Sequence, residues 1–353
     1  MNYPALKINL TKLENNTRLL VEKCAPYGIS ISAVTKVFCG MTEVAEAVVK
    51  GGAAILADSR VENLKKLRNF NLPKMLLRIP MLSQIDEVLE YADISLNSEY
   101  KVIEALSNAA VKKGKIHDII LMVDLGDLRE GVWADDAVEY AGKILQLKGV
   151  NLKGIGTNLT CYGAIIPQED NLSKLEEIAN MITQKYGIKL SIISGGNSSS
   201  LYMVEEGRIP KAINNLRLGE SIVLGNETAY GKRIEGTYND CFTLCAEIIE
   251  LKEKPSVPIG EIGVDAFGNR PTFVDRGIRK RGILAVGKQD VRIDGLTPID
   301  SDIIILGASS DHMIIDITDS TKEYTIGDII EFTLDYGALL STSTSDYVKK
   351  VIE

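Results

Sequence analysis

The sequence predicts an α/β fold in two parts, a (β/α)8 TIM-type barrel followed by a C-terminal all-β domain. Between residues 30 and 220, eight short apolar runs alternate with amphipathic helical segments, which is the order of a parallel barrel. After Gly231, short β-rich runs follow one another, separated by Gly, Pro and Asp. A chain of 353 residues also exceeds the usual size of one compact core. We therefore expect a barrel domain over residues 11–230, and a β domain over residues 231–353 that includes residues 1–10.

The strand candidates of the barrel are apolar rather than alternating, as strands buried on both faces of a parallel sheet should be. They are Ile29–Val37, Ala53–Ala57, Lys74–Arg78, Ala92–Leu96, Asp118–Asp124, Asn151–Gly156, Leu190–Ser194 and Ile213–Leu218. The helix candidates between them are Thr42–Lys50, Ser98–Lys113, Asp135–Lys148 and Pro167–Tyr186. This alternation is typical of βαβ units that close into a barrel.

Both ends of the chain are expected to contribute to the β domain. Ala5–Leu10 is a strand candidate that precedes the barrel and should pair with the C-terminal domain, while Thr11 and Glu14 match a capping box for a helix that runs to Cys24. The C-terminal strand candidates are Cys241–Leu251, Arg281–Val286, Ile303–Leu306, Met313–Ile317 and Ile329–Leu334. Their spacing of about ten residues and the near absence of helical periodicity indicate a β-sandwich or β-barrel.

Composition argues against several classes of partner. The net charge is −8 without a basic stripe, so nucleic acid is not expected. No apolar run approaches the roughly 18 residues of a membrane helix, and the N-terminus lacks the pattern of a signal peptide. Two histidines without cysteines at ligand spacing predict no metal site. The five cysteines are odd in number and scattered, which argues against a disulfide framework and favours the cytoplasm.

A lysine stands at the end of the first barrel strand, in Val34-Thr35-Lys36-Val37. Burial among apolar residues disfavours a charged amine, and a desolvated lysine is the nucleophile that imine formation requires. The alternative is a lysine whose side chain extends from the strand end to water. Because barrel active sites lie at the C-terminal ends of the strands, we favour Lys36 as a catalytic amine.

Two turns carry the composition of a phosphate site. Ser194-Gly195-Gly196-Asn197-Ser198-Ser199-Ser200 follows the seventh strand, and Arg217-Leu218-Gly219-Glu220 follows the eighth. Glycines let a phosphate approach the backbone, while hydroxyls and amides bind it. One Gly/Ser turn alone is more often only a turn. Two of them after strands seven and eight, the usual phosphate platform of these barrels, predict a phosphorylated ligand.

These motifs resemble, in their order and spacing, those of the alanine racemase family, fold-type-III enzymes that bind pyridoxal phosphate. The matching segments are Val34-Thr35-Lys36, Val123-Asp124-Leu125-Gly126 with Arg129, Gly196-Asn197-Ser198, Arg217-Leu218-Gly219 and Ser310-Asp311-His312-Met313. They span nearly the whole chain. The variant Thr35-Lys36-Val37-Phe38-Cys39-Gly40 looks most like the ornithine racemase branch of that family. The resemblance therefore implies a pyridoxal-phosphate-dependent racemase of ornithine or another basic amino acid.

The resemblance also implies roles for single residues. Lys36 would form the Schiff base with pyridoxal phosphate and act as one catalytic base. The other cofactor-binding positions would be Arg129 at the phenolic oxygen, Arg217 at the pyridine nitrogen with Asn158 beside it, and Ser198, Gly219, Glu220 and Tyr347 at the phosphate. Alternatively, Arg129 is a surface arginine and Tyr347 a packed C-terminal tyrosine. Because arginine only donates hydrogen bonds, a pyridine nitrogen opposite Arg217 stays unprotonated, which favours racemisation over transamination.

The sequence departs from the family pattern where the second base is expected. Family members have a tyrosine near the start of the β domain, supplied by the partner subunit, but residues 260–265 contain none. Racemisation needs a proton donor and acceptor on opposite faces of the substrate. The candidates are Asp265, which we favour slightly, Glu261 and His312, while Ser310 and Asp311 match substrate-binding positions. Each carboxylate could instead be a solvated loop residue.

The family arrangement also implies partners. The β domain of one subunit completes the site of the other, so we expect a two-fold homodimer. A small-molecule amino-acid substrate is the other expected partner, and an acidic residue near the site could select the ammonium group of a basic side chain.

Three other functions remain open at this point. A basic amino-acid decarboxylase shares the outline but places a carboxylate near the pyridine nitrogen and usually a cysteine from the β domain, so Arg217 argues against it while Cys241 and Cys245 argue for it. A non-catalytic pyridoxal-phosphate carrier would not need the β domain. A phosphosugar enzyme of the same barrel would lack pyridoxal phosphate and be colourless.

Overall fold

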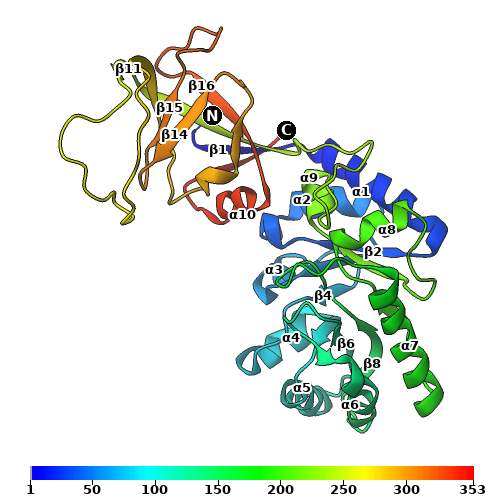
Figure 1. The fold of residues 1–353 in the computed structure, drawn as a ribbon. Coiled ribbons are helices and arrows are strands. Elements are labelled where there is room, and N and C mark those ends of the chain that lie inside the picture. The colour runs from blue at the N-terminus through cyan, green and yellow to red at the C-terminus, as the bar shows by residue number, and fades with distance from the viewer. Residues whose placement is uncertain (1) are drawn as a thin grey trace. The chain divides into compact units, whose positions relative to one another are not determined.

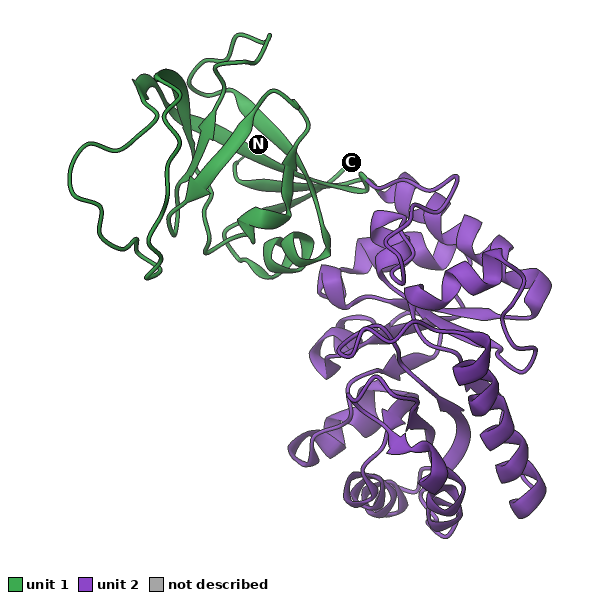
Figure 2. Cartoon of the chain, viewed as in Figure 1, with its two compact units in different colours: residues 1–9, 240–353 green, residues 10–239 purple. Residues whose placement is uncertain are grey.

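The computed structural model describes residues 2–353 and divides into two compact units (Figures 1 and 2). Unit 2 comprises Leu10–Asn239, and unit 1 comprises Asp240–Glu353 with the residues up to Asn9. The barrel unit therefore ends at Asn239, later than the residue 230 that the sequence pattern suggests. The segment before Asn239 packs with unit 2, because the side chain of Asn16 donates to the Tyr238 carbonyl at 2.8 Å and accepts from the Tyr238 amide at 2.7 Å.

Unit 2 contains a closed barrel of eight parallel strands. They are β2 (Ser30–Val34), β3 (Ile55–Asp58), β4 (Lys74–Leu76), β5 (Ile94–Asn97), β6 (His117–Asp124), β8 (Val150–Gly156), β9 (Ile192–Ser194) and β10 (Asn215–Leu218). The order β5-β4-β3-β2-β10-β9-β8-β6 is closed by a β5–β6 pairing. The predicted (β/α)8 barrel is confirmed, and each strand falls within two residues of its expected start. A two-residue strand, β7 (Val132–Trp133), extends β6.

Alternate residues of the strands fill the barrel interior, as the two-residue period of a strand requires. The pairs Ile55 with Ala57, Ile94 with Leu96, and Ile120 with Met122 pack into one buried cluster with Val34 and Met75. This apolar packing fixes the positions of the strand ends, where the candidate site residues lie.

Helices cover the outside of the barrel (Figure 1). They are α1 (Leu10–Cys24), α2 (Thr42–Lys50), α3 (Val61–Lys66), α4 (Ile85–Tyr91), α5 (Tyr100–Lys112), α6 (Ala137–Ile144), α7 (Glu169–Tyr186), α8 (Leu201–Glu205) and α9 (Glu220–Leu224). The expected capping box is wrong, because α1 begins at Leu10 and Thr11 lies inside its first turn. Among residues 2–353, no helix combines the length and the apolarity needed to cross a membrane.

Unit 1 is built on a mostly antiparallel sheet. Its strands are β1 (Ala5–Ile8), β11 (Phe242–Pro255), β12 (Ile278–Leu284), β13 (Leu296–Pro298), β14 (Ile304–Ala308), β15 (Met313–Asp316), β16 (Ile329–Leu334) and β17 (Lys349–Ile352). The main order is β13-β16-β11-β12-β15-β14. The N-terminal strand β1 pairs antiparallel with β11 and parallel with β17, so its predicted pairing with the C-terminal part of the chain is confirmed.

One helix of unit 1 was not expected from the sequence. α10 (Tyr336–Thr344) begins at an Asp335 cap, whose Oδ1 accepts from the Ala338 amide at 2.8 Å. Its buried face includes Thr342 and Ser343 beside Ala338 and Leu339. Because hydroxyl side chains share the buried face, the apolar periodicity that marks an amphipathic helix is weak here.

Candidate active site

Lys36 lies at the C-terminal end of the barrel, immediately after β2. The strand ends at Val34, and Lys36 opens a short 3-10 turn that ends at Phe38. Contrary to the sequence-based expectation, Lys36 is therefore outside the buried strand, and its side chain is exposed. The chain leaves the sheet at Thr35 and reverses through left-handed backbone at Cys39 and Gly40, with φ of 54° and 62°. The exposed amine is placed where barrel enzymes bind their substrates.

A carboxylate that the sequence reasoning missed lies beside this turn. Asp58, the last residue of β3, is fully buried. Its Oδ2 accepts from Thr35 Oγ1 at 2.5 Å, and its Oδ1 accepts from the Arg60 amide at 2.8 Å and from Asn63 Nδ2 at 3.1 Å. Burial raises the pKa of Asp58, and these hydrogen bonds and the charge of Lys36 oppose that rise. An acidic residue at the end of an otherwise apolar strand was the available signal.

Arg217 is a buried cation on β10, with a side chain only 4% exposed. Its guanidinium donates to Ser194 Oγ, to the Thr157 carbonyl at 2.7 Å and to Asn158 Oδ1 at 3.4 Å. Burial lowers the pKa of Arg217 to about 10, so the group stays charged at neutral pH. All three acceptors are uncharged, and the carboxylate whose charge acts on Arg217 is that of Glu130.

Several buried polar atoms around Arg217 lack a hydrogen-bond partner. Within residues 2–353 they include Thr157 Oγ1, Asn158 Nδ2 and Ser199 Oγ, all just beyond the ends of β8 and β9. The Asn158 amide oxygen also accepts from Asn197 Nδ2 at 3.0 Å. Buried polar groups are seldom left unsatisfied, so this concentration at one end of the barrel indicates a site for a polar ligand.

The two phosphate-type turns meet in the structure. Ser198 Oγ lies 3.0 Å from Ser221 Oγ and accepts from the Ser221 amide at 3.2 Å. Ser198 therefore contacts Ser221, the residue that follows Gly219 and Glu220 in the chain. The two turns meet because β9 and β10 are neighbouring parallel strands. Gly196 has φ of 112°, and a Cβ there would approach only the Ser200 hydroxyl. The backbone is thus open to a ligand oxygen at this turn.

Arg129 lies in the loop after β6. Its guanidinium donates to both carboxylate oxygens of Glu130. Burial by itself would lower the pKa of Arg129, but the hydrogen bond and the charge of Glu130 outweigh it and raise the pKa. Arg129 is therefore an exposed arginine that forms an ion pair with its chain neighbour Glu130.

Asp127 joins the Arg129 loop to the loop after β8. The buried carboxylate accepts from the amides of Cys161 at 3.3 Å, Tyr162 at 3.0 Å and Ile165 at 3.2 Å. The two loops contain three non-glycine residues in the left-handed region, Leu128, Thr160 and Ala164. Such backbone costs energy and persists only where surrounding contacts impose it. Asp127 supplies those contacts and thereby fixes the loops that carry Arg129 and Asn158.

In unit 1, the β14–β15 hairpin carries Ser310, Asp311 and His312, and all three side chains are exposed. His312 Nδ1 lies 2.8 Å from Asp311 Oδ1. This hydrogen bond is the main cause of the lowered pKa of Asp311. A histidine oriented through Nδ1 by a carboxylate presents Nε2 for proton transfer.

The other unit 1 candidates are arranged differently. Asp265 closes its own turn, with Oδ1 accepting from the amides of Asn269 at 2.8 Å and Phe267 at 2.9 Å, and these bonds lower its pKa. Glu261 is exposed. Tyr347 has a side chain 66% exposed, so it is not the packed C-terminal tyrosine of the alternative interpretation.

Seven of the thirteen sequence-predicted site residues lie at the carboxyl ends of barrel strands in unit 2. These are Lys36, Arg129, Asn158, Ser198, Arg217, Gly219 and Glu220. The other six, Glu261, Asp265, Ser310, Asp311, His312 and Tyr347, belong to unit 1. The barrel set offers an amine, two guanidinium groups, hydroxyls and unpartnered polar atoms. These groups fit a ligand that carries a phosphate, an aldehyde and a ring atom that accepts a hydrogen bond. Within residues 2–353, no group of three His, Cys, Asp or Glu side chains could hold a metal.

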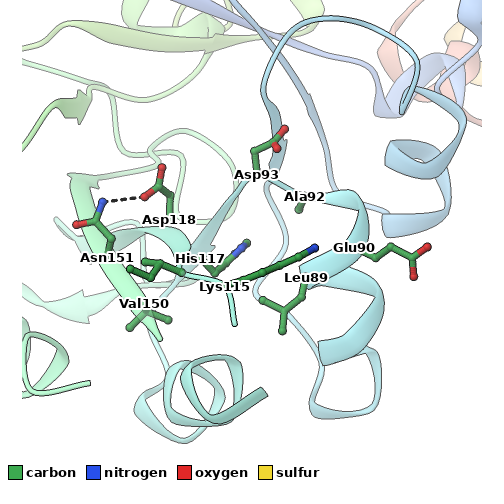
Figure 3. A pocket seen from close by; sticks show the side chains of 10 residues that line it. Leu89, Glu90, Ala92, Asp93, Lys115, His117, Asp118, Val150 and Asn151 are labelled. Atoms are coloured by element: carbon green, nitrogen blue, oxygen red, sulfur yellow. Dashed lines mark hydrogen bonds between the residues drawn. The ribbon is translucent and has the colours of Figure 1, made fainter. Parts of the chain in front are cut away.

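A cavity of about 660 Å³ lies at the other end of the barrel (Figure 3). Its lining includes Asp93, Lys115, His117, Asp118 and Asn151, which precede or begin β5, β6 and β8. Asp118 accepts from Asn151 at 2.7 Å, and buried His117 is hydrogen-bonded to Ser95 Oγ at 2.8 Å. These hydrogen bonds lie at or near the N-terminal ends of the strands, which serve stability rather than catalysis in barrels of this kind.

We expect His117 to make the barrel sensitive to acid. Burial lowers its pKa to about 4 from 6.5, so between these pH values the unfolded chain binds a proton that the folded chain excludes. Stability is therefore lost as the pH falls, by about 3 kcal/mol at pH 4. In His117→Gln, the free energy of unfolding in urea should fall less between pH 7 and pH 4. An equal fall in both proteins would contradict this assignment.

Comparison with known proteins gives consistent matches over the whole chain. Residues 8–227 match the family model for the alanine racemase N-terminal domain. The chain is 51% identical over 349 residues to an ornithine racemase of Acetoanaerobium sticklandii, covering 99% of both chains. It is 43% identical over 355 residues to a lysine racemase of Thermotoga maritima, covering 100% of this chain and 99% of that protein. The fold matches a Bartonella henselae alanine racemase with covalently bound pyridoxal phosphate, with TM-score 0.76, 18% identity and 100% coverage of both chains.

Proposed function

The chain belongs to the alanine racemase family, and from this premise we propose that it is a pyridoxal-phosphate-dependent racemase of a basic amino acid, ornithine or lysine. The observation that carries the proposal is the identity of 51% and 43% to an ornithine racemase and a lysine racemase over nearly the full chain. The barrel end supports it, because its donor groups suit the cofactor that the homologous fold binds covalently.

Lys36 is the residue that would hold the aldehyde carbon of pyridoxal phosphate through Nζ. Arg217 would donate to the ring nitrogen with Asn158 beside it, and Arg129 to the phenolic oxygen. The phosphate would be bound by Ser198, Gly219 and Glu220, with Tyr347. When bound, pyridoxal phosphate supplies the conjugated ring that delocalises negative charge from the substrate α-carbon. The buried charge of Arg217 and the unpartnered atoms near it are the observations that this assignment explains.

Racemisation requires proton transfer on both faces of the α-carbon. Lys36 would serve one face, since its side chain is exposed at the barrel end. For the other face we favour His312, because Asp311 orients its ring and leaves Nε2 for the substrate proton. Asp265 is a weaker proton acceptor, since two backbone amides already bind its carboxylate. Glu261 stays a third candidate, and Ser310 and Asp311 would help to bind the substrate.

A second copy of this chain is the proposed macromolecular partner. The loop between β11 and β12 exposes a run of apolar side chains, among them Ile259, Val264 and Val274 at 92%, 72% and 73%. Isolated exposed apolar residues are ordinary, but several in one loop mark a contact surface. We propose a homodimer that covers this loop and brings the β14–β15 hairpin to the partner's barrel. A monomer mass by light scattering would contradict this part of the proposal.

The cytoplasm is the proposed location, and neither a membrane nor nucleic acid is a proposed partner. Five free thiols in residues 2–353 suit a reducing compartment. The net charge of −8 disfavours nucleic acid. The amino acid itself is the proposed small-molecule partner.

The decarboxylase alternative finds little support. Its β-domain cysteine would have to reach a substrate, but Cys241 and Cys245 are 1% and 0% exposed at the start of β11. Arg217 also stands where that class places a carboxylate. A carrier without catalytic activity would not account for the hydrogen-bonded Asp311 and His312 pair.

The proposal predicts which amino acid is racemised. We expect protein loaded with pyridoxal phosphate to convert L-ornithine or L-lysine to an equal mixture of enantiomers, at least about tenfold faster than L-alanine. In D2O the product should carry deuterium at the α-carbon. Chiral chromatography and NMR measure both. Release of labelled carbon dioxide would favour the decarboxylase, a preference for alanine would overturn the substrate class, and a protein without absorbance at about 420 nm would overturn the cofactor assignment.

A further inference from the structure

The turn that carries Lys36 is tied to β3 and α3 by a chain of hydrogen bonds, which are buried at Thr35 and Asp58 and exposed at Lys66. At its start, Thr35 is fully buried; its amide donates to the Ala57 carbonyl at 2.8 Å, and its hydroxyl donates to Asp58. Asp58 in turn accepts from Asn63 at 3.1 Å. Lys66 Nζ then donates to Asn63 Oδ1 at 3.2 Å and to the Cys39 carbonyl at 2.7 Å. These hydrogen bonds therefore hold Thr35 at the start of the turn and Cys39 at its end.

The packing of this turn leaves little freedom. A Cβ on Gly40 would lie 2.9 Å from Asn63 Cβ, so α3 rests directly on the end of the turn. The Gly40 amide donates to the Thr35 carbonyl at 3.1 Å and closes the turn on itself. Because the Lys36 side chain is exposed, contacts of its own do not bury it. The backbone that this network holds sets the point from which the Lys36 side chain extends.

Asp58 is an expensive residue for a purely structural role. A buried carboxylate costs more to desolvate than a neutral amide or hydroxyl that could accept the same hydrogen bonds. Its hydrogen-bond donors Thr35, Arg60 and Asn63 contribute a hydroxyl, a backbone amide and a side-chain amide, all uncharged. The cation whose charge acts on Asp58 is Lys36.

We propose that Asp58, acting through the Thr35 hydroxyl, is a positioning residue that sets where Lys36 presents its amine. This inference rests on the proposed function, in which Lys36 holds the cofactor and moves the substrate proton. In this role Asp58 contacts neither the cofactor nor the substrate. It fixes the turn and places a negative charge beside Lys36.

The Thr35 hydroxyl is the point at which the proposal is tested most directly. Thr35→Val keeps the size and removes the hydrogen bond, whereas Thr35→Ser keeps the hydroxyl. We expect Thr35→Val to lower kcat by roughly 10- to 100-fold with KM within about twofold. The lysine–cofactor absorbance should also return more slowly when protein stripped of cofactor is remixed with pyridoxal phosphate. Thr35→Ser should recover most of both losses.

Thr17→Val is the matched control. Thr17 is equally buried, and its hydroxyl donates to the Leu13 carbonyl at 2.8 Å on α1, outside the Lys36 turn. This variant should match the parent in kcat and in the recovery of absorbance. Asp58→Asn removes the charge and keeps the size, and should act like Thr35→Val, while the double variant should lose little more than either single one.

The outcomes distinguish a failure of the proposed function from a failure of the positioning role of Asp58. If the parent protein itself neither binds pyridoxal phosphate nor racemises amino acids, the proposed function fails. If the parent does both and Thr35→Val equals the Thr17→Val control in kcat and absorbance recovery, the positioning role of Asp58 is refuted alone. Equal losses in Thr35→Ser and Thr35→Val would also refute it, because the hydroxyl would then be irrelevant.

Discussion

Lys36→Ala is expected to abolish the absorbance of the protein at about 420 nm and to lower racemisation by at least about a thousandfold. Lys36 is the single residue assigned both tasks, the covalent hold on the cofactor and proton transfer on one face. Its exposed position after β2 makes the substitution mild for the fold, since the side chain is not part of the packed core. The measurement is the visible spectrum, before and after borohydride, together with the rate of enantiomer exchange. Racemisation at the parent rate would overturn the assignment.

His312→Asn is the informative control for that experiment. Asparagine keeps a polar group near Asp311 but cannot exchange a proton at neutral pH. We expect this variant to keep the absorbance that Lys36→Ala loses, and yet to racemise slowly. If Asp265→Asn lowers the rate and His312→Asn does not, the second base is Asp265, and the preference for His312 is wrong.

The barrel could be predicted because its signal is local and repeated. Each apolar run such as Ile55–Asp58 or Ile94–Asn97 is a strand buried on both faces, and eight of them with helices between allow few other arrangements. Once that topology is assigned, the carboxyl ends of all eight parallel strands must lie at the same end of the barrel. Residues such as Lys36, Ser198 and Arg217 then fall at one end of the barrel without any further information.

What could not be predicted depends on pairing between segments distant along the chain. Thr35 bonds to Asp58 across 23 residues, and Ser198 bonds to Ser221 across the same separation. No spacing rule identifies such partners before the strand register is known. The burial of Lys36 was also misjudged, because the residue at which a strand ends is set by the turn that follows. Here that turn is held by Asp58, a residue whose own importance appears only in three dimensions.

Arg217→Glu is the second change with a large expected effect, because it replaces the buried cation with an acid. At pH 7 the guanidinium is protonated, since its pKa is about 10. It has five donors and no acceptor, so a ring nitrogen facing it accepts a hydrogen bond but no proton. A glutamic acid could protonate that nitrogen, deepen the electron sink and favour protonation away from the α-carbon. The ratio of keto-acid release to racemisation should then rise on the order of tenfold or more.

The control for this change is Arg217→Lys, which keeps a cationic donor in the same pocket. Both variants lose part of the bonding to Thr157 and Ser194, so both should unfold more easily than the parent. Only the glutamate variant should change the ratio of products, because a carboxylate stabilises a protonated ring nitrogen and an ammonium group disfavours it. If Arg217→Glu retains the absorbance and releases keto acid in the parent's proportion, Arg217 does not govern the fate of the substrate proton. The preference for racemisation would then have to come from Lys36 and the opposite base alone, through the rate at which they return a proton to the α-carbon.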